Sequence, residues 1–189
     1  MKTNKILWIT VIALIFLFLL YMGLTFYLPG WRMRDEAEER TSFRWSEVEA
    51  VACEASPPGV RYLVFSDIPG EENPFRPMME TLRLTGPVRV QDGLGGEGYY
   101  CITVLLTSGE TVEIRFLSGG FSADEDVTAG HLLGEYREGW GSTRIYVGVE
   151  VKTASLQALV KDPALQITCE EYNALSWVRP TSCPEDGDA

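Results

Sequence analysis

A run of 23 uncharged residues near the N-terminus, residues 6–28, constrains this chain more than any other feature. Only Thr10, Gly23 and Thr25 in the run fall outside the apolar set. At about 1.5 Å per helical residue, the run is long enough to cross a hydrocarbon core of about 30 Å. The sequence therefore predicts a single membrane-spanning helix that contacts the lipid bilayer through residues 6–28.

A short basic tail, residues 1–5, precedes this run, which is the layout of an export signal. We expect the signal to stay uncleaved as an anchor, because the run exceeds the roughly 7 to 15 residues of a signal-peptide core and no convincing small-residue cleavage site follows it. The positive-inside rule argues the other way, since four arginines lie within positions 32–44. We favour an exported domain, because large domains translocate largely regardless of charge. The alternative is a domain that faces the cytoplasm.

The chain after the anchor is strongly acidic. All 27 acidic residues follow Gly30 with 14 of the 16 basic ones, which leaves a formal charge of −13. This charge opposes binding to nucleic acid and to anionic lipid, both of which need clustered Lys and Arg. We therefore expect no nucleic-acid partner.

Composition divides the chain after the anchor into three parts. Residues 29–45 are mostly charged and lack an apolar stripe, so we expect a stalk that continues the anchor helix. Residues 46–179 suit one compact domain, and residues 180–189 form an acidic tail. The predicted fold class is α+β, with a mainly antiparallel sheet of about five or six strands and about three packed helices.

The predicted strands come from apolar residues that alternate with polar ones. Residues 100–107 and 111–116, joined by Ser108-Gly109-Glu110, predict an antiparallel hairpin. Alternation over residues 144–152 predicts another half-buried strand. Short apolar runs at 46–53 and 60–65 predict two further strands on either side of a Pro- and Gly-rich turn.

Three helices are predicted from apolar stripes and capping residues. The clearest follows Asn73-Pro74 and ends at Gly86-Pro87. A second spans roughly residues 154–160, and a third follows Thr168, which forms a capping-box pattern with Glu171. The apolar stripes consist of Phe75, Met78, Met79 and Leu82 in the first helix, Leu156, Leu159 and Val160 in the second, and Tyr172 and Leu175 in the third.

The four cysteines are Cys53, Cys101, Cys169 and Cys183. None forms a C-x-x-C motif, which disfavours a zinc ribbon and a thioredoxin-type redox pair. Outside the cytoplasm we expect Cys169 to pair with Cys183, because this bond would hold the C-terminal segment. Cys53 with Cys101 follows by elimination as a second pair. The alternative is that the thiols are buried or unpaired.

Two sequence features resemble parts of known binding sites but do not predict a cofactor or metal site. Residues 93–98 match G-x-G-x-x-G, but a predicted strand follows them where a dinucleotide site needs a helix, so we interpret them as a turn. His131 is the single histidine, which excludes zinc sites that need two or three imidazoles. We interpret His131 as an ordinary loop or partly buried residue. No cofactor is predicted.

Two segments are candidates for a contact surface. Asp124, Glu125 and Asp126 form the densest acidic loop, but they lack the alternating ligand frame of a calcium loop, so we expect a solvated loop. Trp140 lies between Gly139 and Gly141, where it can contact a partner or a sugar ring or can fold back on the end of the sheet.

A basic tail, one helix and one compact domain make up the whole chain, an organisation that resembles that of small membrane-anchored proteins of bacteria. The resemblance carries no diagnostic motif, so it implies no catalytic residue and no substrate. The sequence favours a non-enzymatic, extracytoplasmic module that binds or senses a protein or small molecule at the cell membrane. The alternatives are an envelope hydrolase that uses acidic residues or a Cys169/His131 pair, and a cytoplasmic-facing accessory subunit of a membrane complex.

Overall fold

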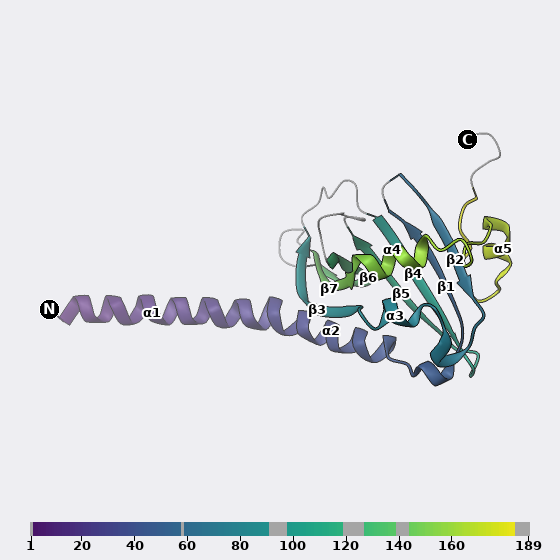
Figure 1. The fold of residues 1–189 in the computed structure, drawn as a ribbon. Helices are drawn as coiled ribbons and strands as arrows, with labels where there is room; N and C mark the ends of the chain where they lie inside the picture. The colour runs from purple at the N-terminus through teal and green to yellow at the C-terminus, as the bar shows by residue number, and fades with distance from the viewer. Residues whose placement is uncertain (1, 58, 91–97, 119–126, 139–143, 184–189) are drawn as a thin grey trace.

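The computed structural model describes residues 2–57, 59–90, 98–118, 127–138 and 144–183. It is an α+β protein with an antiparallel sheet, as the alternating patterns predict. The described strands form one sheet in the order β2-β1-β4-β5-β6-β7-β3 (Figure 1). They are β1 Val48–Ser56, β2 Tyr62–Ser66, β3 Arg83–Val90, β4 Gly98–Leu106, β5 Thr111–Ser118, β6 Val127–Glu138 and β7 Arg144–Lys152.

The β4–β5 hairpin confirms the strongest strand prediction. Leu105 pairs with Thr111, and the Leu106 N–H donates to the Glu110 carbonyl oxygen at 2.9 Å. Gly109 has a φ of 83°, a left-handed conformation that glycine adopts at little cost. Strand β6 was not predicted, and it brings the strand number to seven, above the expected five or six.

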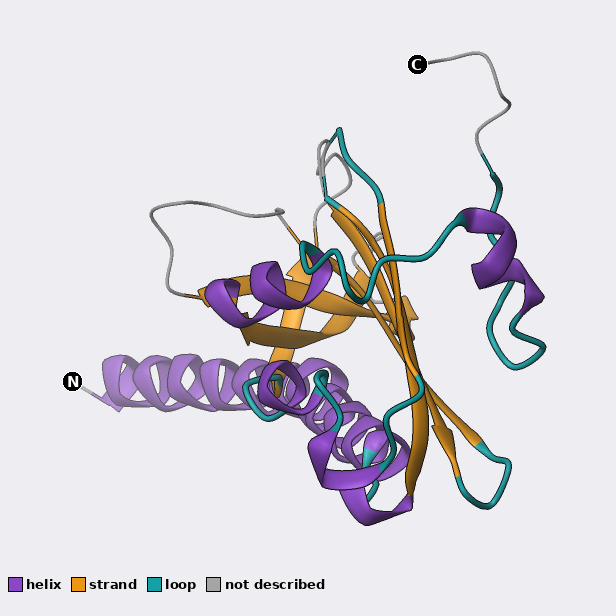
Figure 2. Cartoon of the chain, turned by 45° about the vertical axis from the view of Figure 1, so that its right-hand side comes forward, coloured by secondary structure: helices purple, strands orange, loops and turns teal. Residues whose placement is uncertain are grey.

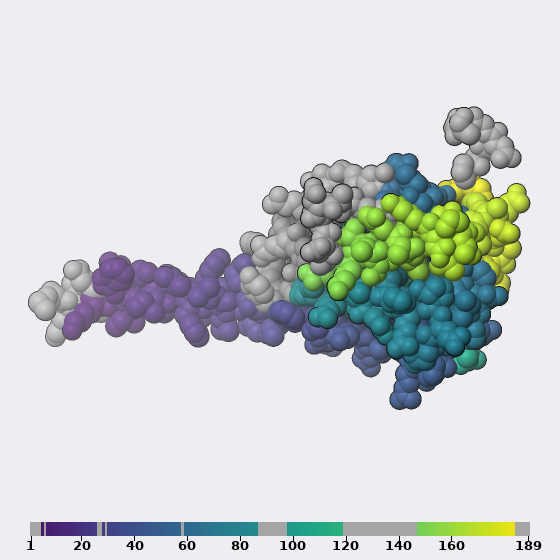
Figure 3. All heavy atoms as spheres, viewed as in Figure 1, coloured from purple at the N-terminus to yellow at the C-terminus, as the bar shows by residue number. Residues whose placement is uncertain are grey.

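The N-terminus is one long helical run in three parts. Helix α1 covers Lys2–Met22, a π-helical turn covers Gly23–Tyr27, and helix α2 covers Leu28–Thr41. The π-helical turn ends two residues before Pro29, whose missing N–H donor interrupts the regular α-helical ladder. This run is long and apolar enough to cross a membrane, and its most apolar window is not buried in the rest of the structure. The space-filling view shows α1 projecting from the packed domain (Figure 3).

Helix α2 differs from the predicted stalk, because it packs on the sheet. Gly30 and Ala37 are buried, and Met33 packs against the hydrophobic core. The three residues lie on one helical face at i, i+3 and i+7. Gly30 and Ala37 are too small to be recognised in the sequence as part of an apolar stripe. Small side chains let the helix approach the strands closely. The apolar helical run therefore continues into the domain without a free linker.

The main core lies between the sheet and three helices, which are α2, α3 (Arg76–Met79) and α4 (Figure 2). Helix α4, Thr153–Val160, buries Leu156, Leu159 and Val160 as predicted. On the sheet, Tyr100 and Phe116 stack with their ring centroids 5.0 Å apart. Apolar burial on this scale stabilises a domain by about 25 cal/mol per Å² of buried apolar surface.

The helix predicted up to Gly86 is much shorter in the structure. Helix α3 covers only Arg76–Met79, and the chain enters β3 at Arg83. The predicted stripe is still largely buried, since Phe75 and Met78 are less than 2% exposed. Pro87, expected to end a helix, lies within β3, and the register shifts between Leu84 and Pro87. Because β3 is an edge strand, a residue without an N–H is tolerated there.

The opposite face of the sheet carries helix α5, Cys169–Ala174. The predicted capping box is present, with the Glu171 N–H donating to the Thr168 hydroxyl and the Thr168 N–H donating to the Glu171 carboxylate. Tyr172 packs in a second core cluster with Ala52 and Leu63. The segment before α5 also covers the outer edge of β2, where Phe65 donates to Leu165 at 2.8 Å. This cover leaves less of the β2 edge open to pairing with another chain.

Candidate functional site

The contact surface predicted from the sequence lies outside the described residues. The structure does not describe the four residues of this surface, Asp124, Glu125, Asp126 and Trp140. Residues 93–97 of the glycine motif also lie outside the described residues. Their roles stay predictions. His131 lies in strand β6, between Leu117 and Gly148 in the backbone register, so of the two expected alternatives the loop position is wrong, and partial burial stays a prediction.

The four cysteines divide into one disulfide and two free thiols. Cys169 and Cys183 form a disulfide whose Cα atoms are 5.6 Å apart. The second expected pair is wrong, because Cys53 and Cys101 are both free and buried. Cys53 pairs in register with Ile102, so the side chains of Cys53 and Cys101 point to opposite faces of the sheet. No disulfide can join them across the sheet.

The free thiols are held in their protonated form. Burial raises the pKa of Cys53 well above its ordinary value. Burial also raises the pKa of Cys101 to about 12, and the neighbouring Glu113 carboxylate adds to the effect. The Cys101 thiol donates to Glu113 Oε1 at 3.4 Å, and that oxygen also accepts from Arg115 at 3.0 Å. Neither thiol is a nucleophile at neutral pH.

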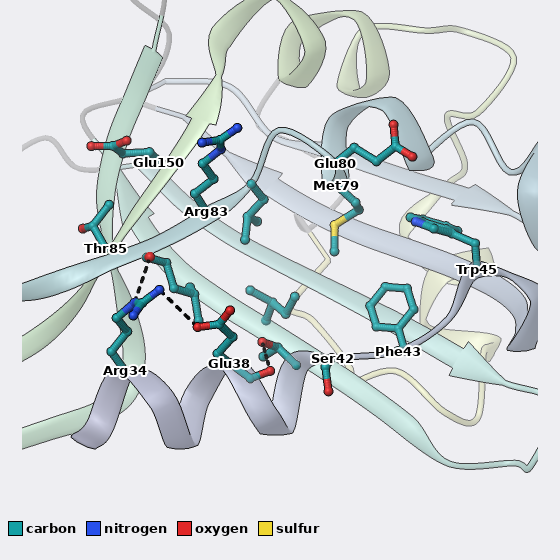
Figure 4. Close-up of a pocket in the computed structure, with 14 residues that line it drawn as sticks. Arg34, Glu38, Ser42, Phe43, Trp45, Met79, Glu80, Arg83, Thr85 and Glu150 are labelled. Carbon is teal, nitrogen blue, oxygen red and sulfur yellow. Dashed lines mark hydrogen bonds and ion pairs between the residues drawn. The ribbon is translucent and has the colours of Figure 1, made fainter. Parts of the chain in front are cut away.

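A groove of about 550 Å³ lies between α2, the segment from α3 into β3, and the sheet (Figure 4). We call it the α2 groove. Its apolar side chains are Phe43, Trp45, Met79, Leu82, Leu84 and Ile114. Its ionisable side chains are Arg34, Glu38, Glu80, Arg83 and Glu150. A mixed lining of this kind suits a ligand with both apolar and charged parts.

The apolar lining comes from three separate parts of the chain. Ile114 on β5 is buried beneath the groove, whereas Met79 and Leu82 are only partly buried beside it. Phe43 and Trp45 follow the end of α2 and form an edge-to-face pair with their ring centroids 5.4 Å apart. The helix end, the short α3 and the sheet are thus all needed to shape the groove.

Arg34 joins the helix wall to the strand wall. Its Nε donates to the Leu84 carbonyl oxygen on β3 at 3.2 Å. Its guanidinium also lies 3.2 Å from the Glu38 carboxylate and 3.4 Å from the Asp35 carboxylate. The two carboxylates beside it offset the positive charge of Arg34, which makes Arg34 a weak site for an anionic ligand. Its main effect is to hold α2 against the edge strand.

The remaining charges at the groove are exposed. Glu38 and Glu80 have side chains 61% and 54% exposed, and Glu80 accepts from Arg76 Nε at 2.7 Å through Oε1. Arg83 pairs in register with Glu150, and Figure 4 shows Arg83 pointing away from α2. The five ionisable residues that line the groove sum to −1. In the described part of the chain, no three His, Cys, Asp or Glu residues gather as a metal site.

The groove lies at a fixed position along the N-terminal helical run. Arg34 is six residues beyond Leu28 and Thr41 is thirteen beyond it, which corresponds to about 9 Å and about 20 Å of helix. The headgroup layer of a bilayer is only about 5 to 8 Å thick on each side. If residues 6–28 span the membrane, the groove lies just beyond the headgroups.

A smaller polar site holds the C-terminal segment to the opposite face of the sheet. The Glu54 carboxylate accepts from Arg61 at 2.7 Å and from the Thr181 hydroxyl at 2.8 Å. Arg61 also donates to the Ser182 carbonyl oxygen. Together with the Cys169–Cys183 bond, these contacts fix residues 181–183, so we interpret this site as structural.

Comparison of the chain with protein-family models, curated proteins and solved structures finds no match in any of the three. The helix, the α2 groove and the disulfide are therefore the features of the molecule that bear on its function. Sequence reasoning missed the groove because it treated residues 29–45 as a stalk and extended a helix through Arg83. The spacing of Gly30 and Ala37 was the one signal that could have indicated a packed helix.

Proposed function

We propose that this protein is a single-pass membrane protein whose domain binds a ligand in the α2 groove, outside the cytoplasm and without catalysing a reaction. One observation carries the proposal. The helical run that is long and apolar enough to cross a membrane continues into α2, which forms one wall of the groove. The ligand site is thus built on the anchor itself.

The disulfide supports a domain outside the cytoplasm. Bonds such as that between Cys169 and Cys183 persist in oxidising compartments and are rare where thioredoxin and glutathione keep thiols reduced. Cys183 is exposed, so a cytoplasmic reductant would reach this bond. The short basic N-terminal tail agrees with the same orientation.

Binding is favoured over hydrolysis by the state of the candidate catalytic groups. The Cys169 sulfur is held in the disulfide, so a Cys169/His131 pair has no thiolate nucleophile. In the α2 groove, Glu38 and Glu80 are each bonded to an arginine, Arg34 and Arg76. Such ion pairs rigidify the walls and serve recognition rather than proton transfer.

The test uses the full chain expressed in bacterial cells. We expect the protein to stay in the membrane pellet after alkaline carbonate extraction, with a mature mass that includes residues 6–28. Protease added to cells whose outer layer is opened should remove the domain. Two of the four thiols should react only after reduction. A cleaved N-terminus, or a domain protected from protease with four reduced thiols, would contradict the proposal.

A further inference from the structure

Building on this proposed function, we propose that the α2 groove binds an extended segment of a partner protein that carries a Lys or Arg side chain flanked by apolar side chains. The cation is seated at the end of the groove formed by Trp45 and Glu80. The proposal follows from the shape of that end, the apolar lining, the charge balance and the height above the membrane.

The end of the groove far from the anchor combines an aromatic ring with a carboxylate. Trp45 and Glu80 both lie at this end, beyond Met79 (Figure 4). Trp45 is only partly buried, and the Glu80 side chain is 54% exposed. The bond from Arg76 engages Glu80 through Oε1. Because both residues line the same end of the groove, a Lys or Arg head bound there would lie near the indole and the carboxylate, and an indole ring attracts a cation.

The middle of the groove is apolar and adaptable. Met79, Leu82 and Leu84 are partly buried, and Phe43 closes the apolar part beside Trp45. The Met79 side chain can accommodate varied apolar partners, since its thioether is flexible and polarisable. The two leucines add apolar surface beside it. Apolar residues on either side of the cation would cover these side chains.

The charge balance favours a cationic ligand over an anionic one. Arg34 is already opposed by Asp35 and Glu38, and Arg83 points away from α2. Arg76, which bonds to Glu80, is shared with Glu71, so this group of three side chains also sums to −1. The groove lining sums to −1, and the chain after the anchor carries 14 positive against 27 negative charges. An acidic surface of this kind raises the encounter rate with basic segments and lowers it with acidic ones.

The height of the groove favours a peptide over a membrane lipid. The groove runs from about 9 to about 20 Å of helix beyond Leu28, whereas headgroups reach only about 5 to 8 Å. A lipid held in the bilayer does not extend to Trp45. An extended peptide at about 3.3 Å per residue covers the roughly 11 Å between the two ends with three or four residues.

The experiment uses the full chain in phosphatidylcholine nanodiscs and a fluorescein-labelled pentapeptide, Ser-Leu-Lys-Leu-Ser, blocked at both ends. Two matched peptides replace the central lysine by glutamate or by norleucine. Fluorescence anisotropy gives the Kd of each, and empty nanodiscs give the background. We expect the lysine peptide to bind at least tenfold more tightly than the glutamate peptide, with norleucine in between.

Substitutions in the groove test whether the peptide binds there. Glu80→Gln and Trp45→Leu should each weaken binding of the lysine peptide about 3- to 10-fold, while Glu80→Asp should keep most of it. The matched controls are Glu72→Gln, an exposed carboxylate outside the groove lining, and Trp177→Leu, which alters the second core cluster on the opposite face of the sheet. Both should stay within twofold of the unchanged protein. If Trp45→Leu exposes the thiols of Cys53 and Cys101, Trp45→Phe replaces it.

Three results would overturn the inference: no binding of the lysine peptide, equal binding of the glutamate peptide, or equal losses in the groove and control variants. These results leave the anchor and the side of the membrane untouched, because extraction and protease exposure test those separately. A cytoplasmic domain that binds the lysine peptide would instead overturn the orientation alone.

Discussion

The indole of Trp31 lies over the backbone of Gly86, so close that a Cβ atom at position 86 would stand 3.0 Å from two of its ring carbons. Trp31 is near the start of α2, and Gly86 is in the edge strand β3. The guanidinium of Arg34 stacks 5.7 Å from the same ring and bonds to Leu84 on the same strand. These contacts hold the N-terminal helical run against the domain.

Replacing Gly86 by Ala should therefore unseat Trp31 and destabilise the domain by about 1 kcal/mol, as small overpacking changes do. In a Trp31→Ala background the same change should cost less than about 0.5 kcal/mol, because the ring that it would meet is gone. Thermal unfolding of the four proteins in one detergent measures the coupling. Equal costs in both backgrounds would show that the two residues do not interact.

A second prediction compares a buried residue of α3 with an exposed residue at the start of β3. Met78 is 1% exposed, so Met78→Ala should destabilise the domain by about 2 to 5 kcal/mol. Arg83 is exposed, and Arg83→Ala should cost less than about 0.5 kcal/mol. Chemical denaturation of both variants tests the assignment. Similar losses would mean that the buried stripe is misplaced.

The sequence predicted best the elements whose signals are local. The turn at Gly109, the stripe of α4 and the capping box of Thr168 and Glu171 all depend on residues within one or two turns of each other. Whether these three features form does not depend on which strands lie beside them. The same holds for β7, whose alternation is uninterrupted.

The predictions that failed depend on distant partners. Ala37 becomes a core residue only because the sheet accepts a close helix, and Pro87 is acceptable in β3 only because that strand ends the sheet. Whether Cys53 meets Cys101 is decided by strand register, and a shift of one residue reverses the face of every side chain. The α2 groove depends on the packed helix and on the edge strand, so no local pattern could reveal it.

The free thiols give a third prediction. In the native full chain, Cys53 and Cys101 should resist alkylation, because burial raises the pKa of both thiols. Denaturation should release two reactive thiols, and denaturation with reduction should release four. Mass spectrometry after iodoacetamide treatment counts them. Fast labelling of either thiol in the folded protein would contradict the buried positions.

The same thiols predict loss of stability in alkali. An unfolded cysteine ionises near pH 8.5, whereas Cys101 in the fold has a pKa of about 12. Between these values the unfolded state releases a proton that the folded state keeps, so stability falls as pH rises. A Cys101→Ser variant should lose less stability than the unchanged protein between pH 9 and pH 11. Parallel curves would contradict this assignment.

Another prediction concerns Glu171 in acid. Hydrogen bonds from the backbone N–H and hydroxyl of Thr168 lower the pKa of this carboxyl. Its contribution to stability is therefore present above the unfolded pKa of about 4.3 and is lost as pH falls through the lower folded value. Glu171→Gln should destabilise the domain at pH 7, and the difference should shrink below about pH 4. A difference independent of pH would contradict the role of the charged carboxylate.

The central claim is that one helix crosses the membrane and continues into the wall of the α2 groove on the outer side. Single cysteines at Thr3 and Ser42, on either side of residues 6–28, test it in intact cells with a membrane-impermeant maleimide, since the native cysteines are bonded or buried. We predict that Ser42→Cys is labelled in intact cells and that Thr3→Cys is labelled only after the cells are permeabilised. Labelling of Thr3→Cys alone in intact cells, or equal labelling of both, would contradict the claim.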